Sequence, residues 1–435
     1  MEKTLSEQIY GYLADDEDAR VCKDIPDAAC NEQPISFTLQ LVSQSLSKLA
    51  DTLSSAKLVL AWILSSLGAP AIFLSLLVPV RESLSLLPQL FIAQVIRELP
   101  VRKWAWVAGA IGQGVALIGM VIAIGQLTGA AAGYAVIGLL ALLSLSRGIC
   151  SVAHKDVLGK TISKSRRGRL TGTATTISGV IALGSAALLI LGLAPENLQL
   201  YSVMLLSAAA LWMIAAFTFG QLPEVAGATE GGGNAFSEAL QSLSLLKTDD
   251  DFRAFVIARA LLIATAFATP YLVILIQQSG SGALTGLGVL IFADGLAAMS
   301  SGYFWGKLSD TRSHHVMALS AVLSVLTIAT AIALYTFQQN LFTHYFVGGS
   351  LLFLASVAHQ GTRVGRKTYL VDLANSDNRA QYTAVGNTVI GVMLLVGGTV
   401  GIADAMLGTI SVLYILAAVG ILAIMQSLRL KNVAD

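Results

Sequence analysis

Charged residues are scarce in this chain of 435 residues: they make up 12% of it, whereas 55% of the residues are hydrophobic. A soluble globular domain carries about 25% charged residues, so this sequence lacks the polar surface that would coat such domains. Disordered and fibrous proteins do not have this composition either. The net charge of +1 gives no overall attraction to nucleic acid. The composition therefore predicts a protein that spans a membrane several times.

Cysteine is also rare, with three residues in the whole chain. Three scattered thiols are too few for a disulfide framework or a zinc site. The sequence also lacks the His-Glu-x-x-His, Gly-x-Ser-x-Gly and P-loop signatures of metal, hydrolase and nucleotide sites. We therefore expect no metal, no cofactor and no enzymatic activity. The first residues show no basic segment followed by an apolar run, so we also expect no signal peptide.

Long apolar runs are what the chain has in abundance. Runs of about 17–25 residues are long enough to cross the roughly 30 Å hydrocarbon core of a bilayer as helices. Their number predicts an all-α membrane protein with twelve transmembrane helices in two blocks of six. The spans are expected at 57–80, 83–99, 103–127, 131–154, 170–193 and 199–220, and then at 252–277, 283–306, 314–336, 344–366, 381–403 and 407–428.

Basic residues predict the orientation. If the N-terminus is cytoplasmic, most lysines and arginines lie in or beside the even-numbered loops, whereas the opposite loops hold only Arg81. Basic residues concentrate on the cytoplasmic side of membrane proteins. We therefore expect both termini in the cytoplasm and the protein in the plasma membrane, which in a bacterium is the inner membrane.

Polar segments divide the chain. They comprise a tail at 1–56, a linker at 221–251 and an end segment at 429–435, so that the two bundles cover 57–220 and 252–428. Within the tail, apolar residues recur at alternating gaps of four and three from Ile35 to Leu53, which predicts an amphipathic helix over 35–53. This helix lies either in the interface of the cytoplasmic leaflet or against the cytoplasmic face of the protein.

The two blocks repeat each other. The word Ser-Val-Ala-His occurs at 151–154 and again at 356–359, in each block near the end of the fourth helix. In the same order along each block, Pro70 matches Pro270 and Gly179 matches Gly391. Duplicated halves around a central substrate site are the architecture of many secondary transporters. We therefore expect two pseudo-symmetric bundles with a site between them.

Two further motifs carry a resemblance to a known family. Residues 306–312, Gly-Lys-Leu-Ser-Asp-Thr-Arg, resemble the cytoplasmic loop signature of the major facilitator superfamily, and 143–151 resemble its membrane-embedded arginine motif. The resemblance covers roughly 57–428. It implies the fold of that family, secondary transport by alternating access, and a role for Arg147 in proton movement or in binding an anion. The arginine motif favours export, whereas residues 179–184 lack the Gly-Pro pair of the antiporter motif, which disfavours it, so the direction of transport stays open.

Asp294 is the deepest carboxylate, near the middle of the span expected at 283–306. A charge among lipid tails costs at least about 2.5–3.5 kcal/mol, so it faces a cavity or a partner. We expect Asp294 to load and release a proton and to exchange Arg147 or Arg259 as its partner. The alternative is a structural ion pair between Asp294 and Arg259. Arg147 and Arg259 either serve the proton or the substrate, or extend to the surface on their long side chains.

The sequence offers further candidate substrate contacts. Trp62 and Tyr271 are expected to line a substrate cavity or to pack in the core. Arg81 and Glu82 are expected in the short outer turn after the first helix, as a substrate contact, an outer gate or a solvated pair.

A charge latch is expected to close the cytoplasmic gate, although solvated loop charges are the alternative. Its residues would be Gly306, Asp310, Arg312, Arg97 and Glu98. His154 and His359 titrate near physiological pH, but their matched positions favour inherited packing.

Together these features predict a proton-coupled, monomeric carrier that moves a small organic solute by alternating access. The lipid bilayer and protons are its other partners. A translocase for amphiphiles or lipids, fed from the leaflet by the 35–53 helix, is the alternative. The missing catalytic motifs disfavour a membrane-embedded enzyme, and the lack of a soluble output domain disfavours a sensor.

Overall fold

A computed structural model describes residues 5–14, 25, 27–191, 198–227, 243–279, 284–374 and 379–433. Within these residues every regular element is a helix. Ten helical segments are long and apolar enough, by length and composition, to cross a membrane. The expected all-α membrane protein is therefore confirmed.

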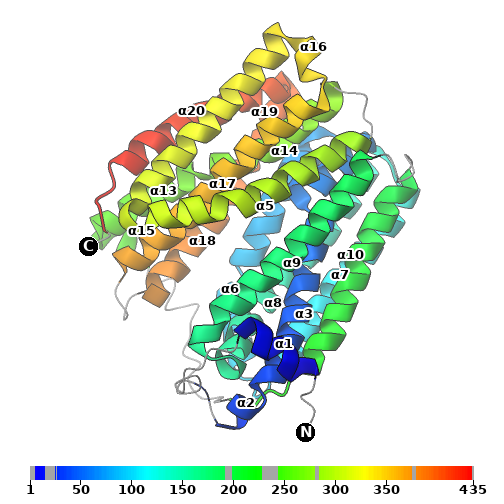
Figure 1. Ribbon diagram of the computed structural model, residues 1–435. Coiled ribbons are helices and arrows are strands. Elements are labelled where there is room, and N and C mark those ends of the chain that lie inside the picture. The colour runs from blue at the N-terminus through cyan, green and yellow to red at the C-terminus, as the bar shows by residue number, and fades with distance from the viewer. Residues whose placement is uncertain are drawn as a thin grey trace.

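The N-terminal part of the chain forms one bundle, drawn in blue to green at the lower right of Figure 1. Helix α3 packs against α9 and α10, α10 packs against α7, and α7 packs against α8. The elements are α1 (Leu5–Ala14), α2 (Asp27–Asn31), α3 (Gln33–Leu53), the π-helix η1 (Ala56–Leu60), α4 (Ala61–Ser66), α5 (Ala71–Leu86), α6 (Gln89–Arg97), α7 (Lys103–Gln126), α8 (Gly129–Thr161), α9 (Lys164–Ile190) and α10 (Leu198–Gly220).

The C-terminal part forms the second bundle, drawn in yellow-green to red at the upper left of Figure 1. Its helix α15 packs against α17 and α20, and α14 packs against the same two helices. The elements are α12 (Leu245–Thr248), α13 (Asp250–Leu261), α14 (Ile263–Ser279), α15 (Leu284–Phe337), α16 (Gln339–Phe342), α17 (Tyr345–Leu373), α18 (Arg379–Gly397), α19 (Val400–Leu407) and α20 (Thr409–Leu428).

A carboxylate fixes the start of the second bundle. The side chain of Asp249 accepts a hydrogen bond from the Phe252 amide at 2.9 Å, which caps α13, and another from the Tyr382 hydroxyl. Partial burial raises the pKa of Asp249, but these hydrogen bonds lower it more strongly, so that it lies below its usual value of 3.8. The ionised form of Asp249 is therefore the one that holds α13 to α18.

The boundary between the first two crossings differs from the prediction. The apolar run 57–80 is not one helix, because the chain turns at 67–70, where Gly68 has a φ of +67° and Pro70 precedes α5. A positive φ suits glycine alone among ordinary residues. The second crossing is α5 followed by α6. The outer turn predicted at Arg81 and Glu82 is therefore wrong, since both residues lie inside α5.

The segment expected to be an amphipathic helix is confirmed as helical but lies elsewhere than expected. Helix α3 packs between α9 and α10 and is followed, after a break at Ser54 and Ser55, by η1 and α4. Its apolar residues Ile35 and Val42 are 40% and 41% exposed, whereas Gln40 and Ser43 are fully buried. The polar face therefore points into the bundle, and α3 is not laid on a cytoplasmic surface.

The predicted match between Pro70 and Pro270 is wrong. Pro70 precedes α5, whereas Pro270 lies within α14, so the two prolines are not structurally equivalent; Pro79 is the proline inside α5. The two Ser-Val-Ala-His words do occupy comparable places, in α8 and α17. Helix α15 joins two of the predicted spans, with a break at Arg312, whose φ and ψ are −150° and 66°.

The bundles contact each other through α9 with α15 and through α5 with α18 and α19. A Cβ placed on Gly401 of α19 would overlap the side chain of Ser75 of α5, and one placed on Gly288 of α15 would lie 2.7 Å from Leu189 of α9. Glycine therefore permits this close approach. These contacts lie toward the end of the bundles that carries the turn 67–70, which we call the far end.

Candidate functional site

An ion cluster lies at mid-length of the first bundle. Asp51 of α3 forms ion pairs with Arg81 of α5, at 3.0 Å, and with Arg147 of α8. The Arg81 side chain is 14% exposed and the Arg147 side chain 39% exposed. Arg147 is thus paired with Asp51, not with Asp294 as expected. Because Asp51 holds both Arg81 and Arg147, neither arginine side chain extends to a helix end.

A second ion pair joins the two bundles. Lys57 of η1 lies 2.7 Å from Asp294 of α15, and the Ser356 hydroxyl of α17 donates a hydrogen bond to the same carboxylate at 2.5 Å. The expected partners of Asp294, Arg147 and Arg259, are therefore wrong. The side chains of Lys57 and Asp294 are 26% and 23% exposed. Because this ion pair is only partly buried, water and protons can reach its carboxylate.

A polar cavity of about 190 Å³ adjoins the Asp51 cluster. Aromatic rings form its inner wall, and amide, hydroxyl and charged groups complete the lining. The lining residues are Gln44, Ser47, Lys48, Asp51, Trp106, Arg147, Cys150, Ser151, His154 and Trp212. The cavity is large enough for a few water molecules or part of a small solute.

None of the five predicted substrate contacts lines this cavity, and three of them are buried elsewhere. Trp62 is 1% exposed and donates from its indole N–H to Tyr201 at 3.0 Å, and Tyr271 is also 1% exposed. Arg259 is 7% exposed and donates to Asn387 of α18 at 2.8 Å. The structure places all three in the core of the bundles. Glu82, by contrast, is exposed, one residue after Arg81 in α5.

The two histidines behave differently from each other. His154 lines the 190 Å³ cavity, with its Nδ1 3.1 Å from the Gln44 amide nitrogen. His359 lies near Thr265 of α14, at 3.5 Å from the hydroxyl. The matched sequence words therefore place one histidine at a cavity and the other at a helix contact.

Direct hydrogen bonds join the two bundles at the far end, and a cavity lies between them at the other end. Gln277 of α14, 9% exposed, donates to the Trp62 carbonyl at 3.2 Å and to the Ser66 hydroxyl at 2.8 Å, which ties the second bundle to the first. At the opposite end a cavity of about 480 Å³ lies between α6 and α8 on one side and α18 on the other. Lys155 and Asn387 line it. We call this the linker end.

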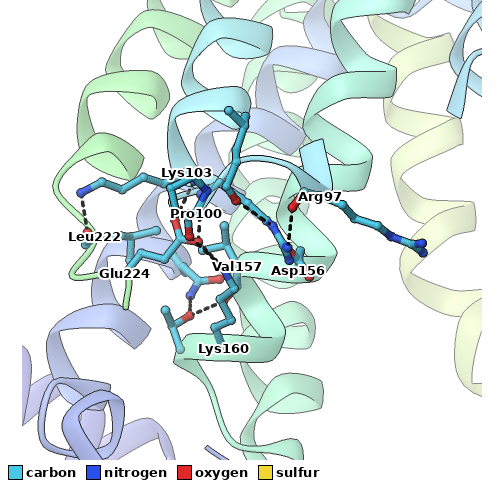
Figure 2. Close-up of polar contacts among 12 residues, drawn as sticks. Arg97, Pro100, Lys103, Asp156, Val157, Lys160, Leu222 and Glu224 are labelled. Atoms are coloured by element: carbon cyan, nitrogen blue, oxygen red, sulfur yellow. Dashed lines mark hydrogen bonds and ion pairs between the residues drawn. The ribbon is translucent and has the colours of Figure 1, made fainter. Parts of the chain in front are cut away.

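The polar contacts at the linker end differ from the predicted gate. Arg97 and Glu98 are exposed, and Figure 2 shows the Arg97 side chain pointing away from the neighbouring contacts. Arg312 is exposed at the break in α15, with Gly306 one and a half turns earlier. The side chain of Asp310 lies outside the described residues. No ion pair joins α6 to α15 in the part of the chain that the structure describes.

Glu224 organises a network within the first bundle instead (Figure 2). Its carboxylate accepts hydrogen bonds from the backbone amides of Arg102 and Lys103, at 3.0 and 2.7 Å, and pairs with Lys160 of α8 at 2.9 Å. A carboxylate at the N-terminus of a helix also interacts favourably with the helix dipole. Arg102 pairs in turn with Asp156 of α8. These contacts hold the turn before α7 to the end of α8.

Several residues of these networks were not predicted as site residues from the sequence. Asp51 and Lys57 belong to segments interpreted as tail and helix start, and Glu224 to the linker. The signal for Glu224 was its position after Pro223 at the end of α10, where a polar segment begins. Arg102 counted only as one more basic loop residue.

Two helical bundles with charged groups between them are an architecture typical of membrane carriers. Residues 41–398 match the family model of the Major Facilitator Superfamily. The match covers most of the chain, so this protein belongs to that family of secondary transporters.

Solved structures share the fold. They include nucleoside transporter NupG (15% identity, TM-score 0.64, covering 91% of this chain and 100% of that chain) and a POT family transporter in complex with a thioalcohol-conjugated peptide (13%, 0.67, 93% and 97%). A D-xylose-proton symporter is also similar (12%, 0.66, 92% and 98%). At these identities the likeness concerns the fold alone. No curated protein sequence matches the chain.

Proposed function

We propose that this protein is a proton-coupled carrier, which moves a small organic solute by alternating access of a site between its two bundles. The observation that carries the proposal is the pair between Lys57 and Asp294, because it links one bundle to the other through a titratable carboxylate. Protonation of Asp294 would remove its charge and weaken the link. The bundles would then rock about the central site.

The same proposal includes the surroundings of the protein. The linker end lies in the cytoplasm, because the basic residues of the even-numbered loops gather there. Both termini are then cytoplasmic, and the protein acts as a monomer in the plasma membrane. Export is the proposed direction, on the resemblance of 143–151 to the arginine motif.

The packing of α3 disfavours the lipid translocase. That alternative needs an amphipathic helix free to collect substrate from the leaflet, whereas α3 contacts α9 and α10 along the bundle. Removal of residues 1–53 would therefore disrupt the bundle and cannot separate the two functions.

Flux in proteoliposomes tests the proposal. A panel of solutes is offered with and without an imposed pH gradient, and a dye in the lumen reports proton movement. The wild type should accumulate at least one solute with the gradient, whereas Asp294→Asn should exchange it without accumulation. Glu98→Gln, which removes an exposed carboxylate, is the control. Accumulation by Asp294→Asn equal to that of the wild type would sink the proposal.

A further inference from the structure

Five basic side chains, on α3 and α8 of the first bundle and on α17 of the second, are not paired with a carboxylate of the described residues. They come from both bundles, and within the described residues none of them forms an ion pair. Lys48 and Lys155 of the first bundle interact electrostatically with Lys367 of the second. The full set is Lys48, Lys155, Arg363, Arg366 and Lys367.

The nearby carboxylates do not neutralise this set. Asp51 is shared by two arginines and Asp294 is paired with Lys57. Glu82 remains, and its charge acts on both Arg147 and Arg366. The charges of Asp51 and Asp294 also reach Lys48 and Arg363, but both carboxylates are already paired, so the basic side chains of the two bundles face one another with an excess of positive charge.

The ordinary excess of basic residues at cytoplasmic helix ends does not account for all of them. Arg363 lies ten residues before the end of α17 at Leu373, which is about 15 Å at 1.5 Å per residue. Arg366 and Lys367 lie three and four residues after Arg363, so both are neighbours of Arg363 on the helix surface. Ser356, which binds Asp294, lies two turns earlier near that face. The basic face of α17 is thus the face toward the first bundle.

The first bundle offers a complementary surface. Although Arg147 is paired, its side chain is 39% exposed, so part of the guanidinium can bind a further group. The adjoining cavity of about 190 Å³ adds the hydroxyl of Ser151 and the amide of Gln44. The Arg81 Nη1 is buried with no hydrogen-bond partner. Charged and neutral donors therefore converge on one region.

We propose that the transported solute is an organic anion whose carboxylate or phosphate group is held between Arg147 of the first bundle and Arg363 and Arg366 of the second. Guanidinium groups bind both kinds of anion through paired hydrogen bonds. A bound anion offsets the repulsion between the bundles and draws them together. This substrate class rests on the carrier function proposed above.

Binding to the purified full-length protein in nanodiscs tests the substrate class. The probes are citrate, glycerol 3-phosphate and inorganic phosphate, with glycerol as the neutral match and choline as the cation. At least one anion should raise the melting temperature, whereas glycerol and choline should not. Citrate alone would identify carboxylate recognition, and the phosphate probes would identify phosphate recognition. If none of the anions binds, or if glycerol or choline binds instead, the inference is wrong.

Variants of α17 locate the site. Arg366→Gln should weaken anion binding by about 10- to 100-fold, the loss expected for a charge-assisted contact. Arg366→Lys keeps the charge, shows that the position tolerates change, and should retain more affinity than the glutamine variant. Arg429→Gln, an exposed arginine after α20, should bind as the wild type does. Equal loss in the Arg366 and Arg429 variants would contradict the proposed site.

Transport separates this inference from the carrier proposal. Uptake of a neutral or cationic solute driven by the pH gradient, with no anion flux, would overturn the substrate class and leave proton coupling intact. Anion flux that ignores the pH gradient and Asp294→Asn would support the substrate class and overturn proton coupling.

Discussion

Removal of the Asp294 charge should shift the balance between the two access states. The pair with Lys57 spans 2.7 Å, and both side chains are about a quarter exposed. Two unit charges about 4 Å apart attract by roughly 4 kcal/mol at an effective dielectric constant of 20. Desolvation offsets part of this energy, so we expect a net stabilisation of about 2 kcal/mol. That corresponds to roughly a 30-fold change in the equilibrium between conformations.

The direction of the shift follows from the geometry. The pair holds the bundles together while the linker end is separated, so Asp294→Asn should favour states in which the far end opens and the linker end closes. Double electron–electron resonance measures the closing of the linker end as the distance between nitroxide labels at Leu99 and Val371, which are both exposed there. The distance distribution should move to shorter values in the variant.

Two controls make the result specific. The double variant Asp294→Asn with Lys57→Gln leaves no unpaired charge, so its distribution should return part of the way to that of the wild type. Acidification should move the wild type toward the Asp294→Asn distribution and leave the variant unchanged. A distribution in Asp294→Asn identical to that of the wild type, at every pH, would refute the reasoning.

Four further changes follow from single contacts. Asp51→Asn leaves two arginines without their counter-charge and should lower stability, seen as a reduced melting temperature in detergent; because the three side chains are 14–39% exposed, the loss should be smaller than the roughly 3–5 kcal/mol of a fully buried pair. Glu224→Gln should cost about 1–3 kcal/mol because the carboxylate binds two backbone amides and a lysine; Glu98→Gln at the same turn should cost nothing in the same measurement. Asp249→Ala removes a helix cap worth about 0.5–2 kcal/mol, and since the pKa of Asp249 is lowered, its contribution is full above about pH 4 and is lost as the pH falls through the lowered value; a melting temperature equal to that of the wild type at neutral pH would contradict it. Gly401→Ala places a methyl group against α5 and should shorten the distance between labels at the linker end; an unchanged distance would show that the contact adapts.

Apolar runs made most of the fold predictable. A helix that crosses a bilayer needs a long stretch of apolar residues, and the spans from 103–127 onward show this signal, except the one at 344–366, whose helix α17 is not among the ten segments apolar enough to cross a membrane. The first crossing failed because 57–80 is continuously apolar although the chain turns within it. Gly68 and Pro70 carried the signal for that turn, but Pro79 and Pro270, which lie inside helices, show that proline alone does not end a membrane helix.

The site was less predictable than the fold. Asp294 stood out because a carboxylate is rare in an apolar run, and the structure does place it at a contact between the bundles. Its partner Lys57 lies 237 residues away in the sequence, and one sequence gives no information on pairing across that distance. Asp51 was overlooked for a different reason, since its helix was interpreted as a surface element.

Helix α3 shows why that interpretation failed. In a soluble protein an apolar stripe marks the face that packs inward, and the sequence was read by that rule. A membrane reverses the preference, because lipid is as apolar as the protein core and small polar residues favour close packing between helices. The hydroxyls of Ser43 and Ser47, one turn apart on the same face, donate to the carbonyls of the preceding turn at 2.6 and 2.7 Å, so they are satisfied within the helix and leave a narrow face for packing. The Ser-rich face therefore packs into the bundle, and this packing carries Asp51 to the two arginines at its centre.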